Sequence, residues 1–178
     1  MCQEVIKFWF EEIKKEQWFA KDKKFDQTIQ ERFQSLHKKA INCELYEWRQ
    51  SPLGRLAEII ILDQFSRNIF REQKEAFDYD ALALALSQEA IHVQANQELN
   101  PPQKAFLYMP WMHSESQKIH EKAMQLFSEP GLEHNLDFEK KHKRIIDRFG
   151  RYPHRNNILG RSSTEEEIEF LKEENSSF

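Results

Sequence analysis

An acid and a base stand four residues apart inside the apolar segment 56–70. On a helix, Asp63 and Arg67 would lie one turn apart on the stripe that also carries apolar side chains, where they can form an ion pair. A charge inside a protein is costly unless it is paired and hydrogen-bonded. We therefore predict a buried Asp63–Arg67 pair, with Gln64 and Asn68 as a second polar pair on the adjacent face.

Two other predicted helices also carry ionisable groups on their apolar stripes. Glu115 shares its stripe with Ile119 and Ala123, and His142 shares its stripe with Ile145. Buried ionisable groups are frequent at functional sites, but structural ion-pair networks produce the same pattern. Both interpretations stay open for each of these side chains.

An arginine-rich segment, residues 148–161, follows the helix that carries His142. Its glycines and its proline indicate tight turns. A guanidinium group can bind a carboxylate or a phosphate through two parallel hydrogen bonds, so such turns could hold an anion. Alternatively, the same arginines bind internal acids and helix-end carbonyls and only connect helices. The polar residues concerned are Arg148, Arg151, His154, Arg155 and Asn156.

The motifs of several well-defined sites are absent from the sequence. It contains no P-loop, no dinucleotide-binding fingerprint, no H-E-x-x-H and no G-x-S-x-G. The spacing E-x-x-H occurs twice, ending at His92 and His142, as it does in dimetal helical bundles. A chain this rich in Glu produces such pairs by chance, so we expect neither a metal site nor a cofactor. From their positions alone, His37, His113 and His134 are expected to be surface or capping residues.

The elements that must position these side chains are predicted to be helices. Strand-forming residues are scarce, with two valines and two threonines in 178 residues. Capping boxes at Ser114/Gln117 and Thr164/Glu167 and a glycine at position 150 give helix boundaries. Pro110 is expected to stop a short helix, and the tail 175–178 is expected to be frayed. We predict one helical domain, residues 1–178, with about eight helices near 3–16, 25–42, 53–71, 79–96, 102–109, 115–128, 136–149 and 165–174.

Composition limits the class of protein and its partners. The longest aliphatic run, residues 59–62, is far too short to span a bilayer, and the first residues lack the apolar run of a signal peptide. Two cysteines cannot make a disulfide framework, so a cytoplasmic protein is expected. The net charge is −4, although residues 140–161 are strongly basic, and this overall field disfavours nucleic acid. We expect neither nucleic-acid nor membrane partners; the oligomeric state stays open.

Several stretches resemble the bacterial family known as domain of unknown function 924: FWF, SPLGRLAEIIILDQFSRNIFR, AFLYMPWMHSES and RIIDRFGRYPHRNNILGRSSTEEEIEFL. The resemblance runs over nearly the whole chain. It implies an all-α fold in which antiparallel helix pairs stack into a tetratricopeptide-like, right-handed superhelix, and it implies no particular reaction. Where this chain has His120 the family tends to have glutamine, so nothing is implied for His120. The family's motif residues fall here on Asp63, Gln64, Arg67, Asn68, Arg71, His113, Glu115, Arg148, Arg151, His154, Arg155, Asn156 and Arg161.

Three functions fit these residues. The first is binding of a small anionic ligand or a peptide carboxylate in a pocket lined by Arg, Asn and His. The second is a hydrolase or lyase acting on an anionic substrate, with acid–base chemistry from the His and carboxylate side chains. The third is a structural scaffold in which arginines and carboxylates only clamp helices together. The candidate binding residues are Asp63, Arg67, Asn68, Arg71, His113, Glu115, His142, Arg148, Arg151, His154, Arg155 and Asn156.

Overall fold

The computed structural model describes residues 1–174 and 176, and these form helices and turns without a β-strand. The all-α prediction is confirmed. When α-helical and π-helical stretches that run on without a break are taken together, this part of the chain contains 8 helices, as predicted. The sequence predicts a frayed tail at residues 175–178. Of these, only Ser176 is among the described residues, and the others lie outside them. Within the described ranges no helix has both the length and the apolar character that crossing a bilayer requires.

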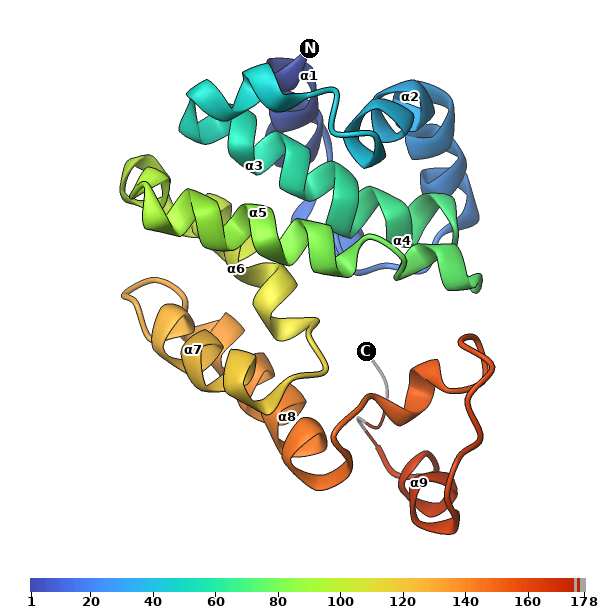
Figure 1. Ribbon diagram of the computed structural model, residues 1–178. Coiled ribbons are helices and arrows are strands. Elements are labelled where there is room, and N and C mark those ends of the chain that lie inside the picture. Colours follow the sequence, from blue (N-terminus) through green and yellow to red (C-terminus); the bar gives the residue numbers. More distant parts are fainter. Residues whose placement is uncertain (175, 177–178) are drawn as a thin grey trace.

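The helices follow one another in a stack of layers (Figure 1). Helix α1 packs against α3, and α2 packs against α4. Helices α5 and α6 form the next layer against α3, and α7 and α8 lie beyond α6. The tetratricopeptide-like superhelix and the single domain stay predictions. The α-helices are α1 (Cys2–Lys7), α2 (Lys23–Ile41), α3 (Pro52–Ile60), α4 (Ser66–Ile69), α5 (Asp80–His92), α6 (Pro101–Met112), α7 (Gln117–Phe127), α8 (Glu133–Phe149) and α9 (Glu165–Phe170).

Aromatic rings fill the main core between these layers. Trp9, fully buried, makes edge-to-face contacts with Phe65 and Phe106, with ring centroids 5.5 and 5.4 Å apart. Such pairs add specific geometry to the burial of a large apolar surface. A second, smaller cluster joins the end of α8 to residues 150–174, which we call the C-terminal segment. The cluster contains Ile146, Tyr152 and Phe170. The C-terminal segment therefore has a small apolar core of its own and depends more on polar contacts.

Local sequence signals explain several helix ends. Thr164 and Glu167 form the predicted capping box of α9, and Gly150 ends α8 in the left-handed conformation with φ +68°. Asn100 caps α6 reciprocally with Gln103, ahead of a proline in the first turn. The capping box predicted at Ser114 is wrong, because its hydroxyl accepts from the Ser116 backbone N–H and α7 begins only at Gln117.

Pro110 does not end its helix, contrary to the prediction. Helix α6 continues through it to Met112. Proline removes one backbone donor and restricts the preceding turn, yet a helix already held by buried packing can carry one near its end. Residues 105–112 are all buried, so tertiary contacts keep the last turn helical. This extra turn carries the chain to His113.

The helix predicted at 53–71 contains a wide turn at its centre. Residues Ile61–Phe65 are π-helical and connect α3 to α4 without a break. Such turns are rare and occur frequently at functional sites. This one contains Asp63 and Gln64, which are both buried.

His37 is buried, which corrects its predicted surface position. Its side chain is 2% exposed, its Nε2 lies 2.8 Å from the Ser66 hydroxyl, and its ring contacts Phe70 and Tyr79. Burial lowers the pKa of His37 from 6.5 to about 4. The imidazole is therefore neutral at physiological pH and belongs to the core.

We expect His37 to make the protein less stable in acid. Because the unfolded chain protonates this ring near pH 6.5 and the folded chain only near pH 4, its contribution is complete above pH 6.5 and is lost as the pH falls towards 4. In His37→Gln, the free energy of unfolding should depend less steeply on pH in this window, by about 1.4 kcal/mol per pH unit. Urea denaturation across the window measures the slope. His92→Gln, on the surface, should keep the wild-type slope, and equal slopes in both variants would contradict this role of His37.

Candidate functional site

The Asp63 carboxylate lies at the centre of the candidate site, with 0% of its side chain exposed. Its Oδ1 is 2.7 Å from Nδ1 of His113, and its Oδ2 accepts a 2.6 Å hydrogen bond from the Gln64 amide. Arg67 lies 3.3 Å from Oδ1 and also donates to the Asp63 backbone carbonyl. Burial by itself would raise the pKa of Asp63, but His113 and Arg67 lower it well below its usual range. The carboxylate is thus ionised, and the predicted Asp63–Arg67 pair is confirmed.

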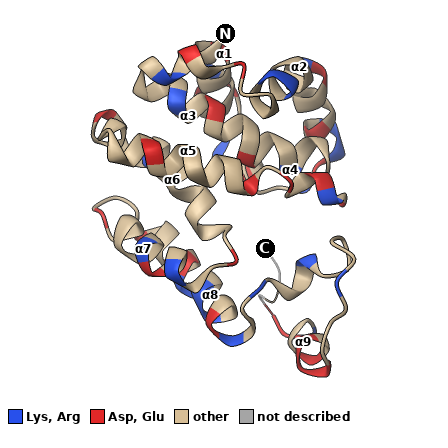
Figure 2. Cartoon of the chain, in the orientation of Figure 1, with Lys and Arg blue, Asp and Glu red and all other residues tan. Residues whose placement is uncertain are grey.

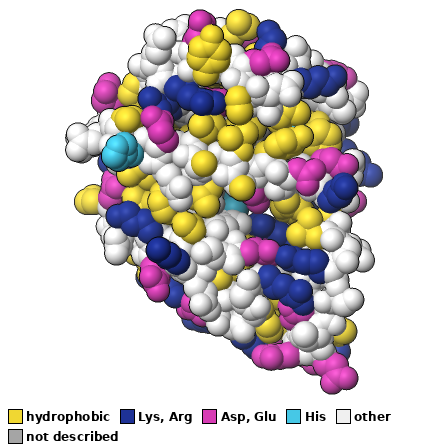
Figure 3. All heavy atoms as spheres, viewed as in Figure 1, with side chains coloured by type: hydrophobic (Ala, Val, Ile, Leu, Met, Phe, Trp, Pro, Cys, Tyr) yellow, Lys and Arg dark blue, Asp and Glu magenta, His cyan; other side chains and the backbone are white. Residues whose placement is uncertain are grey.

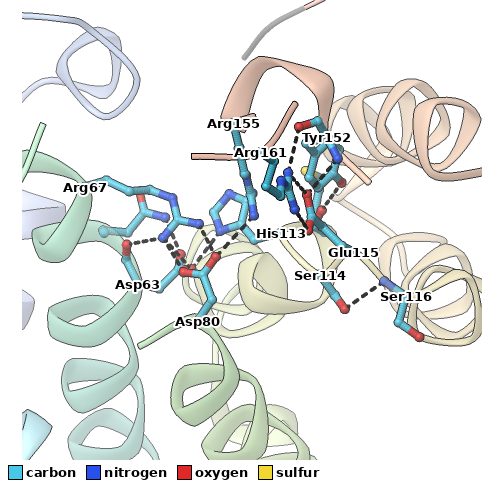
Figure 4. Close-up of polar contacts among 12 residues, drawn as sticks. Asp63, Arg67, Asp80, His113, Ser114, Glu115, Ser116, Tyr152, Arg155 and Arg161 are labelled. Carbon is cyan, nitrogen blue, oxygen red and sulfur yellow. Dashed lines mark hydrogen bonds and ion pairs between the residues drawn. The ribbon is translucent and has the colours of Figure 1, made fainter. Parts of the chain in front are cut away.

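Arg67 extends this network to the start of α5. Its guanidinium forks onto the Asp80 carboxylate with distances of 2.9 and 3.0 Å. Arg155 reaches the same carboxylate from the C-terminal segment, at 3.4 Å. One carboxylate therefore serves two guanidinium groups, and the order Asp63–Arg67–Asp80–Arg155 alternates in charge (Figure 4).

Glu115 anchors the C-terminal segment to the loop between α6 and α7. It accepts a 2.7 Å hydrogen bond from the Tyr152 backbone N–H and two from Arg161, at 2.6 and 2.9 Å. The Tyr152 hydroxyl donates to the backbone carbonyl of Met112. Burial raises the pKa of Glu115, but Arg161 and the Tyr152 N–H outweigh it and leave this pKa below the ordinary value. These contacts bring the arginine-rich segment back to the helices, as Figure 4 shows.

A cavity of about 330 Å³ lies where these groups meet. Charged side chains gather at the surface around this junction (Figure 3). Helices α5 and α6 supply one wall, and the C-terminal segment supplies the other. Exposed Asp78 is part of the lining, so the cavity opens to solvent. Its lining consists of Phe77, Asp78, Asp80, Ala81, Leu84, Pro110, His113, Ser114, Glu115, Arg155 and Leu159.

Arg155, the arginine of this cavity lining, is incompletely paired. It is 6% exposed and lies between the rings of Phe77 and Tyr152, at 4.7 and 4.5 Å from their centroids. Its Nε is buried and has no hydrogen-bond partner among the residues that the structure describes. Burial, together with the nearby Arg67, lowers the pKa of Arg155 despite the attraction of Asp80. The group remains a cation because an arginine pKa starts from 12.5.

The sequence-predicted residues fall into three groups. Five of them belong to the cavity or the network behind it: Asp63, Arg67, His113, Glu115 and Arg155. Asn68 and Arg71 turn away towards Asp26 on α2, so the predicted Gln64–Asn68 pair is not formed. Asn68 and Arg71 are therefore not part of the cavity site, although the sequence grouped them with Asp63 and Arg67.

The remaining predicted residues bind the C-terminal segment internally. Arg148 pairs with Glu166, and Arg151 binds Glu167 on α9. Asn156 contacts Ser163, Glu167 and Arg161. These contacts match the basic and acidic stretches visible on α8 and α9 (Figure 2). The Nδ1–H of His142 donates to the Phe138 backbone carbonyl at 2.8 Å, and His154 packs its ring near that of Tyr152.

Burial dominates the titration of these two histidines. It lowers the pKa of His142 to about 3 and the pKa of His154 to about 4. Neither residue is part of the cavity lining. Both rings are neutral and pack against Tyr152, at centroid distances of 5.7 and 5.5 Å. Their place in the structure is therefore beside the network, next to the tyrosine that anchors the segment.

Some residues of the site have no signal in the sequence. Asp80 looks like a helix-capping residue, and its binding of Arg67 and Arg155 depends on how α5 packs. His120, for which the family resemblance implied nothing, forms a fully buried pair with Glu139 at 2.6 Å. Glu139 stands three residues before His142, but its partner comes from α7 instead. The E-x-x-H spacing thus reflects helix packing, and the described residues hold no cluster of three or more potential metal ligands.

Comparisons with known proteins give two matches. The model of a family of bacterial proteins of unknown function, DUF924, matches residues 5–175. Among solved structures, the protein of unknown function ATU0120 from Agrobacterium tumefaciens is similar, with 33% sequence identity and a TM-score of 0.88. The similarity covers 96% of each chain. No curated protein matches the sequence.

Removing the Asp63 carboxylate should destabilise the protein severely. Asp63→Ala leaves His113 and part of Arg67 without their buried acceptor, at a cost of roughly 3–5 kcal/mol in the free energy of unfolding. Urea denaturation measures this difference. Asp137→Ala removes an acid from an exposed ion pair with Lys140 and should change stability by less than about 0.5 kcal/mol. A similarly small effect in Asp63→Ala would contradict the central position of this carboxylate.

Proposed function

The chain belongs to the DUF924 family of bacterial proteins, and we propose that it binds a small anionic ligand in the cavity that Arg155 lines. The observation that carries this proposal is the incomplete pairing of the Arg155 guanidinium. A buried cation is costly unless its charge and its N–H groups are satisfied. An anion in the cavity would supply what the protein leaves out.

The acids near Arg155 are already bound by other arginines. Asp80 is bound by both nitrogens of the Arg67 fork, and its contact with Arg155 is the longer one, at 3.4 Å. Glu115, the other ion-paired acid of the lining, is held by Arg161. Neither carboxylate is therefore available as a full counter-ion for Arg155. The rings of Phe77 and Tyr152 fix the guanidinium in place, which lowers the entropy lost on binding.

The size and lining of the cavity favour a small ligand with one carboxylate or phosphate group. At about 330 Å³ it lies near the lower end of ligand-binding cavities. Leu84, Pro110 and Leu159 supply apolar wall, and the polar part of the lining consists of Asp78, Asp80, His113, Ser114, Glu115 and Arg155. A free carboxylate of a metabolite-sized acid and the C-terminal carboxylate of a peptide share this chemistry.

The scaffold alternative is supported by the other arginines. Arg71, Arg151 and Arg161 each bind an internal carboxylate. Their contacts are short and most connect segments far apart in the sequence, as an internal clamp requires. Scaffold and binding roles therefore divide between side chains, and Arg155 is the residue whose substitution separates them.

We also propose a cytoplasmic location without nucleic-acid or membrane partners. The two cysteines, both described, form no disulfide, which supports a reducing compartment. Arg148, Arg151 and Arg161 of the basic segment 140–161 are paired with acids of the same chain, which leaves less basic surface for a polyanion.

A ligand panel tests the binding proposal by thermal unfolding. Phosphate, acetate, succinate and a short peptide with a free or an amidated C-terminus separate the possible sources of the anion. A ligand that binds the native state at 100 times its Kd should raise Tm by about 5–10 °C. Arg155→Ala should abolish this shift.

Arg148→Ala is the matched control, because Arg148 forms an exposed ion pair with Glu166 away from the cavity. This variant should respond to the ligand as the wild type does. If no member of the panel shifts the wild type, or if both variants respond alike, Arg155 is a structural cation and the scaffold alternative holds.

A further inference from the structure

His113 presents one ring nitrogen to a buried acid and the other edge of its ring to the cavity. Its Nδ1 lies 2.7 Å from the Asp63 carboxylate, and its side chain, 15% exposed, belongs to the cavity lining. Nε2 forms no hydrogen bond with any residue in the described part of the chain, and it is not among the buried unpartnered atoms. Nε2 is therefore open to a molecule in the cavity.

The ionised partner fixes the tautomer of the ring. Because Asp63 accepts only, Nδ1 must carry the proton that it donates, and in the neutral ring Nε2 then carries the lone pair. Burial and Arg67 lower the pKa of His113 more than Asp63 and Asp80 raise it. The ring is accordingly neutral at physiological pH, with its basic nitrogen on the cavity side.

We propose that His113 is a general base and that the cavity hydrolyses small esters that carry a carboxylate. This inference rests on the proposed anion site, since Arg155 would hold the carboxylate of the substrate. Asp63, which touches no ligand, is the positioning residue that orients the ring.

The reaction needs water as its second reactant. Nε2 takes a proton from a water molecule as its oxygen attacks the ester carbonyl, and the resulting imidazolium is stabilised by Asp63. The tetrahedral intermediate then expels the alcohol, which takes the proton back from Nε2, and a carboxylic acid is released. Ser114 is an unsuitable nucleophile, because no contact joins its hydroxyl to His113 and its oxygen accepts from the Ser116 N–H at 3.2 Å. Direct attack by water fits this lining best.

Two chromogenic esters test the proposal, para-nitrophenyl acetate and para-nitrophenyl hemisuccinate. The wild type should hydrolyse both, and His113→Gln should lower kcat/KM for both by about 100-fold or more. His134→Gln removes an exposed histidine and should leave both rates unchanged. Absence of hydrolysis by the wild type, or equal rates in His113→Gln, would overturn the general base.

The carboxylate of the second ester separates the base from the anion site. Arg155→Ala should raise KM for the hemisuccinate and leave the acetate unaffected. Loss of both rates in His113→Gln together with an unchanged KM in Arg155→Ala would retain the base and refute the anion site. The reverse outcome would retain the anion site and refute the base.

A measurement on the unmodified protein guards against variants that fail to fold. Nitrogen-15 NMR of the histidine rings should find His113 neutral at pH 7 with its proton on Nδ1. A proton on Nε2, or a charged ring, would refute the proposal. Asp63→Asn, where far-UV circular dichroism shows it folded, should move the proton to Nε2 and lower kcat with KM unchanged, which a purely structural role of Asp63 does not predict.

Discussion

The Asp63 carboxylate has no access to water, and this constraint organises the site around it. An ionised group in that position needs hydrogen bonds and positive charge from its surroundings. The π-helical turn supplies Gln64, the next turn supplies Arg67, and the end of α6 supplies His113. The three donors come from the π-helical turn, from α4 and from the end of α6. The carboxylate is therefore satisfied only when all three elements are folded and packed together.

Charge compensation then passes outward from Asp63 and ends incompletely. Arg67 pairs with both Asp63 and Asp80, and Arg155 makes only the longer contact with Asp80. In most proteins a buried cation of this kind has its own counter-ion. The shortfall coincides with a cavity, and it is this coincidence, rather than the number of arginines, that distinguishes Arg155 from the clamping arginines.

The C-terminal segment is held to the helical stack mainly by polar contacts. Its apolar cluster is small, while Glu115 binds both ends of the loop between Tyr152 and Arg161. Segments with few apolar contacts open more readily than a core does. One wall of the cavity is therefore formed by the less firmly packed part of the molecule.

The sequence by itself determined the all-α class, most helix boundaries and the pairing of Asp63 with Arg67. These features depend on spacings of three or four residues, for which helix geometry fixes which side chains meet. Only the tertiary structure decided that His113, 50 residues away, binds Asp63 and that Arg155, 75 residues away, reaches Asp80. It also decided that α6 continues past Pro110 and that His37 is buried. Those contacts depend on how whole helices pack. A local sequence pattern relates residues a few positions apart, so it does not show which distant residues meet in the folded chain.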